Sequence, residues 1–313
     1  MAKDSLAVII PAYKSEFLDR TLESLGRQTD RDFTVYIGDD CSPNPTEETV
    51  RRWTDRMRIV YRRFDSNLGG VSLVKHWNRC LEMAGEEEFF CMFSDDDIME
   101  ENCIASFRRT VREHPGHDVY HFDISIIGPD DAVMSECPPF PPEISAEEFF
   151  TSLYLNKIDA RMPEFVFRRD NFAKCGGFVE FKKAYRSDNA TVMTCAAERG
   201  IRTVSGEKSR VRWRDSGTNV SCIRTAEHLA ELSDANVDFF SWTHRHFSSL
   251  GIRYPLPVRT EAGYVIYPLK ELKPYLGSWK ALRKALKYNP GKDLRYRLKV
   301  LEKAFSGLVL KKG

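Results

Sequence analysis

Short apolar runs that alternate with helical patterns constrain the fold of this chain most strongly. Strands are expected at residues 6–10, 33–37, 58–64 and 89–93, and helices at residues 17–28, 47–56 and 71–84. The first and last runs, Leu-Ala-Val-Ile-Ile and Phe-Phe-Cys-Met-Phe, are typical of strands buried on both faces. Because strands that alternate with helices form parallel sheets, we predict an α/β fold: a doubly wound, mostly parallel sheet with helices on both faces.

Polar residues follow three of the expected strands. They are Pro11-Ala12-Tyr13, Asp39-Asp40 and Ser94-Asp95-Asp96-Asp97. In doubly wound sheets, ligands bind beyond the carboxyl ends of the strands, where these segments would meet. Adjacent carboxylates repel each other unless a cation lies between them, and a hard divalent cation is the usual one. The acidic triplet therefore indicates a metal site, although a triplet alone also fits a solvated turn.

Five motifs in the N-terminal half occur in a fixed order. They are Val8-Ile9-Ile10-Pro11-Ala12-Tyr13, Thr21-Leu22-Glu23-Ser24-Leu25 with Gln28-Thr29, Asp39-Asp40 with Ser42, Asn67 with Gly69, and Ser94-Asp95-Asp96-Asp97. Together they resemble glycosyltransferase family 2, including its spore-coat-type members, with weaker matches as far as residue 221. The resemblance implies the GT-A fold and an inverting, metal-dependent transfer of a sugar from a nucleotide-diphosphate donor to a glycan hydroxyl.

The resemblance also assigns a nucleotide site. Tyr13, with Pro11 and Ala12, falls where the family packs a side chain against the nucleobase, a role that suits an aromatic ring with a polar tip. A tyrosine in the core at the end of a strand is the alternative. Asp40, and less directly Asp39, falls where a carboxylate accepts the N3 hydrogen of uracil, so the resemblance favours a UDP-linked donor.

The acidic triplet receives its roles from the same resemblance. Asp96 is expected to ligate Mn²⁺ or Mg²⁺, which bridges the two phosphates of the donor, and Asp95 to contact the ribose or a metal-bound water. Ser94 stands where the family usually has another acid, and spore-coat-type relatives have a similar hydroxyl. Asp97 is either a further metal ligand or the N-cap of a helix that begins at Glu100, and the cap is favoured.

Three further residues are expected to bind the donor. Asn67 belongs to the fourth motif. Trp77 replaces an arginine of the family, so either Lys75 or Arg79 takes over its contact with the donor, or the contact is lost. Arg214 lies in a segment that resembles the family's Tyr-Arg-x-His-x-x-Ser-x-Ser, and it would pair with the diphosphate. A structural role for Arg214 fits the sequence equally well.

Transfer to a hydroxyl also needs a positioned base. The family places an acidic residue after a Gly-Gly-Phe segment, at the start of a helix, and Gly176-Gly177-Phe178 followed by Asp188 matches that arrangement. Asp188 is therefore the expected catalytic base, and direct attack with a single base implies inversion at the anomeric carbon. Ser187 or Asp188 would also serve as an ordinary N-cap for a helix over residues 190–199.

The length of 313 residues exceeds what one hydrophobic core usually fills. The expected organisation is a catalytic domain at residues 1–222, with a nucleotide-sugar and metal half at 1–128 and an acceptor half at 129–222, followed by a helical, basic region at 223–313. A capping-box spacing from Ser145 to Glu148 marks the first helix of the acceptor half.

The C-terminal region is basic and amphipathic. From residue 270 onward it has 13 basic residues and three acidic ones. Its apolar residues are spaced as one face of two helices: Trp279, Leu282, Leu286, Leu294, Leu298, Leu301 and Phe305. Such a face either lies on an anionic membrane, where lipid-linked acceptors are found, or packs against the catalytic domain.

Composition limits the partners and the compartment. Lys plus Arg number 47 and Asp plus Glu 46, so the net charge of +1 does not indicate a nucleic-acid partner. The chain shows no run of 18 apolar residues and no signal-peptide pattern, and its eight cysteines form no Cys-x-x-Cys pair. We therefore expect a cytoplasmic protein with reduced thiols. Contact of its basic region with the inner face of the membrane is one alternative, and packing of that region on the catalytic domain, which is favoured, is the other.

The expected function is that of a glycosyltransferase in cell-surface polysaccharide biosynthesis, acting on a glycan or a lipid-linked glycan. A non-catalytic nucleotide-sugar binder or scaffold is the alternative, because Trp77, Ser94 and Ser216 depart from the family pattern. A sugar nucleotidyltransferase is disfavoured, since residues 11–16 lack the glycine-rich loop that holds a triphosphate.

Overall fold

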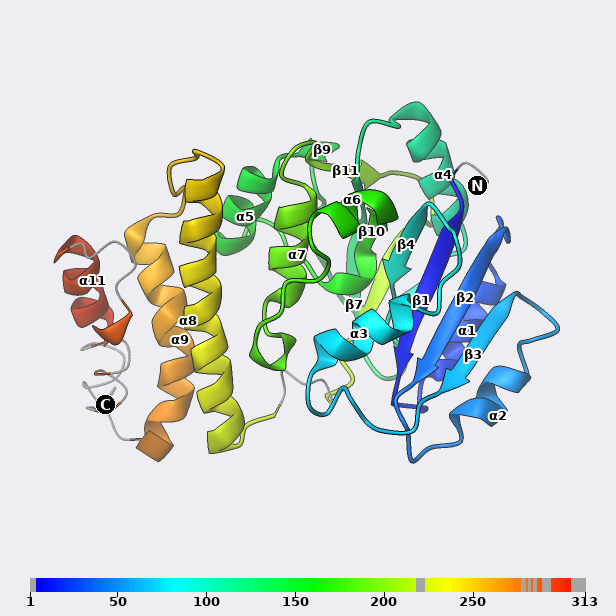
Figure 1. Ribbon diagram of the computed structural model, residues 1–313, viewed down its shortest axis with the longest axis horizontal. Coiled ribbons are helices and arrows are strands. Elements are labelled where there is room, and N and C mark those ends of the chain that lie inside the picture. Colours follow the sequence, from blue (N-terminus) through cyan, green and yellow to red (C-terminus); the bar gives the residue numbers. More distant parts are fainter. Residues whose placement is uncertain are drawn as a thin grey trace.

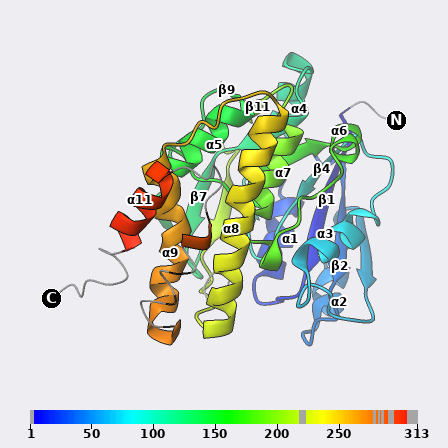
Figure 2. The same ribbon diagram turned by 60° about the vertical axis from the view of Figure 1, so that its left-hand side comes forward.

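The computed structural model describes residues 4–217, 223–276, 280, 283, 286–288 and 294–304. Figures 1 and 2 show an α/β part built on a large twisted sheet, and beside it a layer of helices formed by α8 (Ala226–Ser249), α9 (Val258–Leu276) and α11 (Leu294–Ala304). α8 packs on the α/β part and on α9, and α11 packs on α9. None of the helices in the described ranges combines the length and the apolar character needed to cross a membrane.

The large sheet has eight strands and is mostly parallel. In spatial order they are β3 (Ile59–Arg63), β2 (Phe33–Asp39), β1 (Leu6–Ala12), β4 (Phe89–Met92), β10 (Phe165–Arg168), β6 (Val119–Phe122), β11 (Ile201–Val204) and β9 (Glu143–Ile144). The first four strands are mutually parallel, and β10 lies antiparallel between β4 and β6. The predicted α/β class and the mostly parallel sheet are confirmed.

Helices cover both faces of this sheet, as predicted. The helices of the α/β part are α1 (Leu18–Gly26), α2 (Thr46–Arg51), α3 (Leu73–Leu81), α4 (Cys103–Glu113), α5 (Ala146–Tyr154), α6 (Arg169–Lys174) and α7 (Ser187–Cys195). In β1, Val8 and Ile10 pack in the cluster of α1 and α4, whereas Ala7 and Ile9 pack in the cluster of α3 and α6. This alternation explains why the β1 sequence is apolar throughout.

A second sheet of four strands was not expected from the sequence. It contains, in order, β5 (Ile98–Met99), β12 (Val211–Arg214), β7 (Ile124–Ile127) and β8 (Val133–Glu136). The chain divides at Asp123 into β6 and β7, which join different sheets. The Asp123 carboxylate accepts a hydrogen bond from the Phe140 amide at 3.0 Å, and its carbonyl accepts one from Val211, which fixes the bend.

Two predicted helix starts are wrong. Thr46 is the first residue of α2, after Pro45 at the cap position, and the helix ends at Arg51 instead of Arg56. Asp97 is not an N-cap, because the chain stays extended as β5 and pairs with β12, so that α4 begins only at Cys103. The predicted capping box of α5 is confirmed: Ser145 and Glu148 exchange hydrogen bonds between side chain and backbone.

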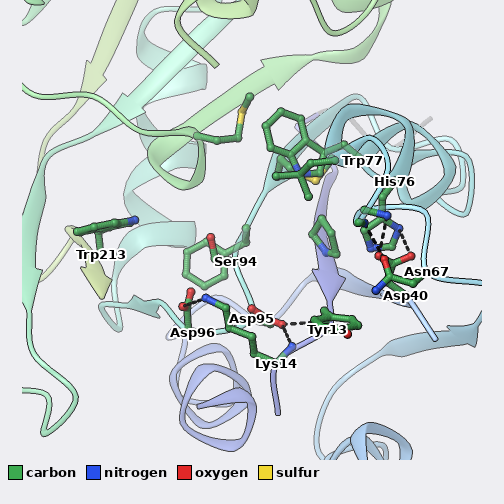
Figure 3. Close-up of a pocket in the computed structure, with 17 residues that line it drawn as sticks. Tyr13, Lys14, Asp40, Asn67, His76, Trp77, Ser94, Asp95, Asp96 and Trp213 are labelled. Carbon is green, nitrogen blue, oxygen red and sulfur yellow. Dashed lines mark hydrogen bonds and ion pairs between the residues drawn. The ribbon is translucent and has the colours of Figure 1, made fainter. Parts of the chain in front are cut away.

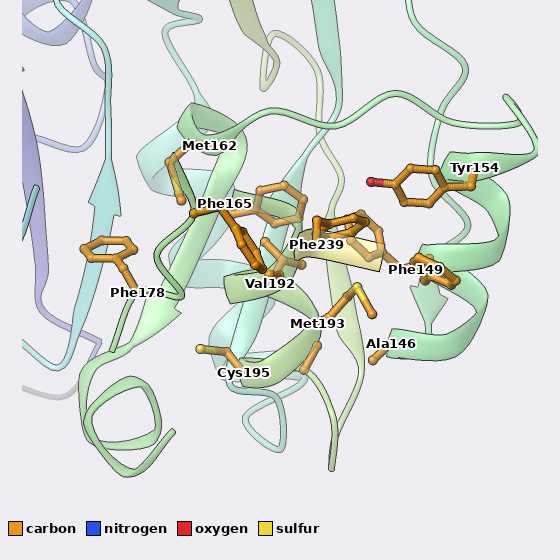
Figure 4. Packing of buried hydrophobic residues seen from close by; sticks show 14 of the residues in the cluster. Ala146, Phe149, Tyr154, Met162, Phe165, Phe178, Val192, Met193, Cys195 and Phe239 are labelled. Atoms are coloured by element: carbon orange, nitrogen blue, oxygen red, sulfur yellow. The ribbon is translucent and has the colours of Figure 1, made fainter. Parts of the chain in front are cut away.

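The helical layer and the acceptor half share one hydrophobic cluster. Figure 4 shows Phe149 and Tyr154 of α5 close to Phe239 of α8, and the Tyr154 and Phe239 ring centroids are 5.6 Å apart. Through α8, the same cluster continues to Leu269 of α9 and Val300 of α11. The boundary predicted after residue 222 therefore does not separate two independent cores.

Of the two alternatives for the apolar face of the C-terminal helix, packing of its leucines against the rest of the protein is not found in α11. Tyr296 and Val300 of α11 are buried, whereas Leu294, Leu298 and Leu301 are 69%, 56% and 39% exposed. The helix therefore turns its leucines away from α9. The predicted apolar positions Trp279, Leu282 and Phe305 lie outside the described residues.

Candidate active site

A cavity of about 370 Å³ opens beyond the carboxyl ends of β1, β2 and β4, where the sequence predicted a ligand site. Figure 3 shows the side chains that line it. Of the predicted site residues, it brings together Pro11, Tyr13, Asp40, Asn67, Asp95 and Asp96. Four predicted donor residues do not line this cavity: Ala12, Asp39, Lys75 and Arg214.

The loop after β1 is fixed by Asp95. Its Oδ2 atom accepts hydrogen bonds from the backbone amides of Tyr13 and Lys14, both at 2.8 Å. The Tyr13 carbonyl accepts a further bond from the Ser42 hydroxyl at 2.6 Å. The Tyr13 ring is 43% exposed and lines the cavity, so it is free of the core and available for stacking.

Asp40 holds the loop that closes the cavity on the side of α3. Its carboxylate accepts hydrogen bonds from the Leu68 and Gly69 amides at 2.8 Å each, and it pairs with Arg79. His76 Nδ1 lies 3.6 Å from the same carboxylate, and burial lowers the pKa of His76 to about 4. The carboxylate of Asp40 faces the cavity while it organises this loop.

Asp39 points away from the cavity although it neighbours Asp40. It is fully buried, and its carboxylate accepts hydrogen bonds from the Ser42 amide at 2.8 Å and the Tyr61 hydroxyl at 2.6 Å. The Arg63 guanidinium lies 2.9 Å from it. Asp39 therefore joins β2 and β3 to the following loop.

The three aspartates after β4 point in three directions. Asp95 faces the loop after β1, Asp96 faces the cavity, and Asp97 accepts a hydrogen bond from the Arg214 amide at 2.7 Å. Burial and the charge of Asp96 raise the pKa of Asp95 to about 7 and that of Asp97 to about 8. Asp96 is therefore the member of the triplet best placed to meet a ligand.

The cavity suits a divalent cation that is shared with a ligand. Among the described residues, no group of three or more His, Cys, Asp or Glu side chains forms a metal site. The Asp96 carboxylate nevertheless faces the cavity and already holds a cation, since the Lys14 ammonium lies 3.3 Å from its Oδ2 atom. Mg²⁺ is commonly bound by one or two carboxylates, with water and phosphate oxygens as the other ligands, and this donor set fits that pattern.

Arg214 supports Asp96 from behind. Its side chain is fully buried, its Nε and Nη1 atoms donate to the carbonyls of Asp96 and Gly128 at 2.7 Å each, and its Nη2 atom lies 2.6 Å from Asp131. Its neighbour Trp213 lines the cavity in its place. This is the structural alternative that the sequence left open for Arg214.

Helix α3 presents a different set of residues from the one predicted. Lys75 is exposed and lies outside the cavity lining. Trp77 and His76 line it, and the Trp77 ring packs on Phe178 with centroids 5.4 Å apart. Asn67, in the preceding loop, lines the cavity as predicted and accepts a hydrogen bond from the Gly70 amide at 2.6 Å.

Asp188 lies in the first turn of α7 and not at its cap. Arg186 occupies the cap position, with a φ of 64°, and no side chain caps the helix. Burial raises the pKa of Asp188, and the Asn189 amide and the charges of Arg186 and Arg161 oppose that shift. Asp188 does not line the cavity. Arg161, whose charge acts on Asp188, lies with its guanidinium over the ring of the cavity residue Trp213, 4.4 Å from the ring centroid.

Six cavity residues had no role in the sequence analysis: Lys14, Gly70, Leu73, His76, Met162 and Trp213. Lys14 could have been found, because it directly follows Tyr13 at the end of a predicted strand. Met162 and Trp213 enter from the acceptor half and the second sheet, so only the tertiary structure brings them to this site.

Known proteins share sequence with this chain. A model of the family described as Glycosyl transferase family 2 matches residues 7–176. The chain is 46% identical over 67 residues to validoxylamine A glucosyltransferase of Streptomyces hygroscopicus subsp. jinggangensis, which covers 20% of this chain and 16% of that protein. It is 28% identical over 124 residues to the poly(ribitol-phosphate) beta-N-acetylglucosaminyltransferase TarS of Staphylococcus aureus, which covers 39% of this chain and 20% of TarS. These matches span at most a fifth of the relatives' length.

Solved structures share the fold over nearly the whole chain. S. aureus TarS 1–349 in complex with UDP-GlcNAc superposes with a TM-score of 0.60 at 18% identity, covering 98% of this chain and 93% of that one. The mannosyltransferase PcManGT from Pyrobaculum calidifontis, in complex with GDP-Man and Mn²⁺, gives 0.53 at 15% identity and covers 98% and 81%. At these identities the likeness shows a common GT-A architecture.

Proposed function

The chain belongs to glycosyl transferase family 2, and we propose that it is an inverting glycosyltransferase which moves a sugar from a UDP-linked donor to a hydroxyl of a glycan. One observation carries the proposal: an aromatic ring, Tyr13, and two carboxylates, Asp40 and Asp96, line a single cavity at the carboxyl ends of parallel strands. The complexes of related folds with UDP-GlcNAc and with GDP-Man support a nucleotide-sugar donor.

In this proposal the nucleoside lies between Tyr13 and Asp40. The exposed ring of Tyr13 stacks on the base. Asp40, fixed by the Leu68 and Gly69 amides, accepts a hydrogen bond from a base N–H, as the N3 position of uracil provides. Asp95 contributes by holding the Tyr13 backbone, and Asn67 by shaping the edge of the cavity.

The diphosphate of the donor lies next to Asp96. A Mn²⁺ or Mg²⁺ ion held by Asp96 would stabilise the negative charge that develops on the departing diphosphate. Arg214 fixes the Asp96 backbone through its 2.7 Å bond to the carbonyl, so the carboxylate is held in place before the donor binds. The side chains of Trp77 and Met162 exclude water from this end of the cavity.

Asp188 is the proposed base that removes the proton from the acceptor hydroxyl. Burial raises the pKa of Asp188 and so makes its carboxylate a stronger base, while the charges of Arg186 and Arg161 oppose that shift. One base and direct attack on the anomeric carbon give inversion. Met162 and Trp213 mark the side of the cavity from which the acceptor enters.

Nucleotide binding tests the donor site. Thermal unfolding is measured with UDP, GDP, CDP, ADP and dTDP, each with and without Mn²⁺, for the wild type, Asp96→Asn and the control Asp55→Asn, whose side chain is exposed outside the cavity. A ligand at about 100 times its Kd adds about 2.7 kcal/mol, or a shift of a few degrees. We expect a shift with UDP that requires Mn²⁺ and disappears only in Asp96→Asn. No shift with any nucleotide would contradict the proposal.

Asp188→Asn separates catalysis from binding. We expect transfer to fall by at least 100-fold while the UDP-induced shift is retained, because the base does not contact the nucleotide. Asp170→Asn, on the exposed start of α6, is the control. If Asp188→Asn left transfer unchanged, another residue would be the base. If no sugar is transferred by the wild type although UDP binds, a non-catalytic nucleotide-sugar binder becomes the better description.

We further propose that the acceptor is a lipid-linked glycan of cell-surface polysaccharide assembly, met at an anionic membrane. The exposed leucines of α11, flanked by exposed Arg295 and Arg297, favour this setting. Sedimentation with phosphatidylglycerol vesicles, and not with phosphatidylcholine vesicles, is expected for the wild type. Leu298→Glu should abolish it and Val133→Glu, at an exposed position of β8, should not.

A further inference from the structure

The diphosphate of a nucleotide sugar carries two negative charges, and a cationic side chain usually meets it. Three of the basic residues that the sequence offers for this role are engaged elsewhere. Lys75 is exposed outside the cavity, Arg79 pairs with Asp40 and the Ser66 carbonyl, and Arg214 is buried behind Asp96. His76 lines the cavity, but burial keeps its imidazole neutral at pH 7 by lowering its pKa to about 4.

Lys14, in contrast to these residues, presents a cationic side chain to the cavity. Among the described residues that line this cavity, it is the one Lys or Arg. Its ammonium lies 3.3 Å from Asp96 Oδ2, and its side chain is 33% exposed. The ion pair therefore covers the oxygen atom that a divalent cation would need.

The backbone of Lys14 is fixed, whereas its side-chain ammonium can move. The Lys14 and Tyr13 amides both donate to Asp95 at 2.8 Å, so the backbone is held on β4. A lysine side chain is a flexible four-carbon stem with a compact charge at its end. The ammonium can therefore leave Asp96 and stay within the cavity without any movement of the loop.

We propose that Lys14 is an exchangeable counter-ion of Asp96: the divalent cation displaces it from the carboxylate, and the displaced ammonium then binds the phosphates of the donor. This inference rests on the proposed function of the same site. It also balances the charge of the Lys14–Asp96 pair at both stages. Before loading, the ammonium balances the Asp96 carboxylate; after loading, the divalent cation and the ammonium together balance that carboxylate and the diphosphate.

The exchange makes metal binding and donor binding cooperative. A metal ion that binds alone must break the Lys14–Asp96 pair, and the Lys14 ammonium then loses the Asp96 carboxylate as a partner. When the donor arrives, its phosphates give that ammonium a partner, so each ligand increases the affinity for the other. Removal of Lys14 should therefore have opposite effects on the two ligands.

Lys14→Met tests the exchange, with Lys174→Met, an exposed lysine at the end of α6, as the matched control. The Kd for Mn²⁺ without nucleotide is measured from the electron paramagnetic resonance signal of free Mn²⁺, and the Kd for UDP at saturating Mn²⁺ by titration calorimetry. For Lys14→Met we expect Mn²⁺ to bind about tenfold more tightly and UDP about tenfold more weakly. Lys174→Met should change neither constant.

Lys14→Arg, which keeps the charge, should bring both constants back toward those of the wild type. If Mn²⁺ bound to Lys14→Met with unchanged or lower affinity, or if no Mn²⁺ bound to wild type and variant alike, the exchange would be refuted. Unaltered UDP affinity would refute the contact with the phosphates. Because the Mn²⁺ titration needs neither donor nor acceptor, an active transferase with unaltered Mn²⁺ binding in Lys14→Met would contradict this inference and leave the proposed function standing.

Discussion

Gly69 shows how a single position controls the nucleotide site. A Cβ atom added there would lie 2.6 Å from Asp40 Oδ2, closer than any normal contact, so Gly69→Ala must displace either the carboxylate or the loop. We expect at least tenfold weaker UDP binding and a loss of about 1–3 kcal/mol in the free energy of unfolding, the usual cost of overpacking. Calorimetric titration and urea unfolding measure the two effects.

Gly116→Ala is the control for this change, since a Cβ atom at Gly116 has no neighbour within 4 Å. It should leave UDP binding unaltered. Equal losses in both variants would mean that the effect comes from backbone flexibility and not from the contact with Asp40.

His121 predicts a dependence of stability on pH. It is buried and stacks on Phe140 with ring centroids 3.6 Å apart, and burial lowers its pKa to about 3. Below pH 6.5 the unfolded chain gains a proton on this residue that the folded chain does not, so stability is full above that pH and is lost as pH falls towards 3. At pH 5 the loss from His121 is about 2 kcal/mol.

The measurement is the change in unfolding free energy between pH 7 and pH 5, for the wild type and for His121→Gln. Between pH 7 and pH 5, His121→Gln should lose about 2 kcal/mol less unfolding free energy than the wild type, whatever its stability at pH 7. His117→Gln, at a half-buried position in the turn before β6, serves as the control. An identical change in wild type and His121→Gln would show that this imidazole is protonated in the fold.

At the scale of residues, the sequence predicts which chemical groups occur near the site better than it predicts where each side chain points. Asp39 and Asp40 have the same side chain, yet only Asp40 faces the cavity, because Tyr61 and Arg63 of the neighbouring strand engage Asp39. Arg214 likewise turns inward because the carbonyls of Asp96 and Gly128 are there to receive it. These partners are distant in sequence, and no local pattern reveals them.

At the scale of elements, Arg186 joins the start of α7 to the helical layer. Its guanidinium donates to the Tyr154 hydroxyl at 2.6 Å and to Asn236 Oδ1 of α8 at 2.8 Å, and it lies 5.5 Å from the Phe239 ring. It stands two residues before Asp188. The position of the proposed base therefore depends on α5 and α8 as well as on its own helix.

Arg186→Lys should weaken this junction, because an ammonium cannot replace the planar donor that reaches both partners. We expect a loss of about 2–3 kcal/mol in unfolding free energy, from the buried polar groups of Tyr154 and Asn236 left without a charged donor. Transfer should fall while UDP binding is retained. Arg199→Lys, at a half-exposed surface site, is the control; a matching loss there would argue against a special role for the junction.

The elements themselves were predicted well where one pattern runs through a segment. β1 and β4 are uniformly apolar, β2 is apolar over most of its first five residues, and α1 and α3 have a helical period, so each was found. The errors lie at residues 97–102, where pairing between distant segments sets the conformation: β5 forms because β12 is beside it. Local propensity is weak at such positions.

At the scale of the whole molecule, the helical layer is part of the folding unit. Phe239, Phe240 and Phe247 of α8 are buried in the cluster that contains Phe149 and Phe150 of α5. Removal of residues 223–313 would expose that cluster to water at roughly 1.5–3 kcal/mol for each large side chain. We expect the shortened chain, residues 1–222, to aggregate or to lack fixed tertiary structure.

Near-UV circular dichroism and limited proteolysis of the shortened chain test this, and the intact chain should unfold in one transition by both fluorescence and far-UV circular dichroism. A stable, soluble fragment that binds UDP would instead support the boundary predicted after residue 222. The sequence could suggest that boundary from composition, but it could not show that both sides contribute to one core.

The antiparallel strand β10 also has a consequence for the synthesis of the chain. β10 lies between β4 and β6 in the sheet. One edge of β4 therefore stays unpaired from the synthesis of residue 92 until residue 168 has been made. At the usual 5–20 residues per second, that interval lasts roughly 4–15 seconds. During it, the ribosome carries a nearly finished nucleotide half with a bare, fully apolar strand along one side. On a polysome, chaperones and neighbouring nascent chains would therefore bind the unfinished protein first at this edge.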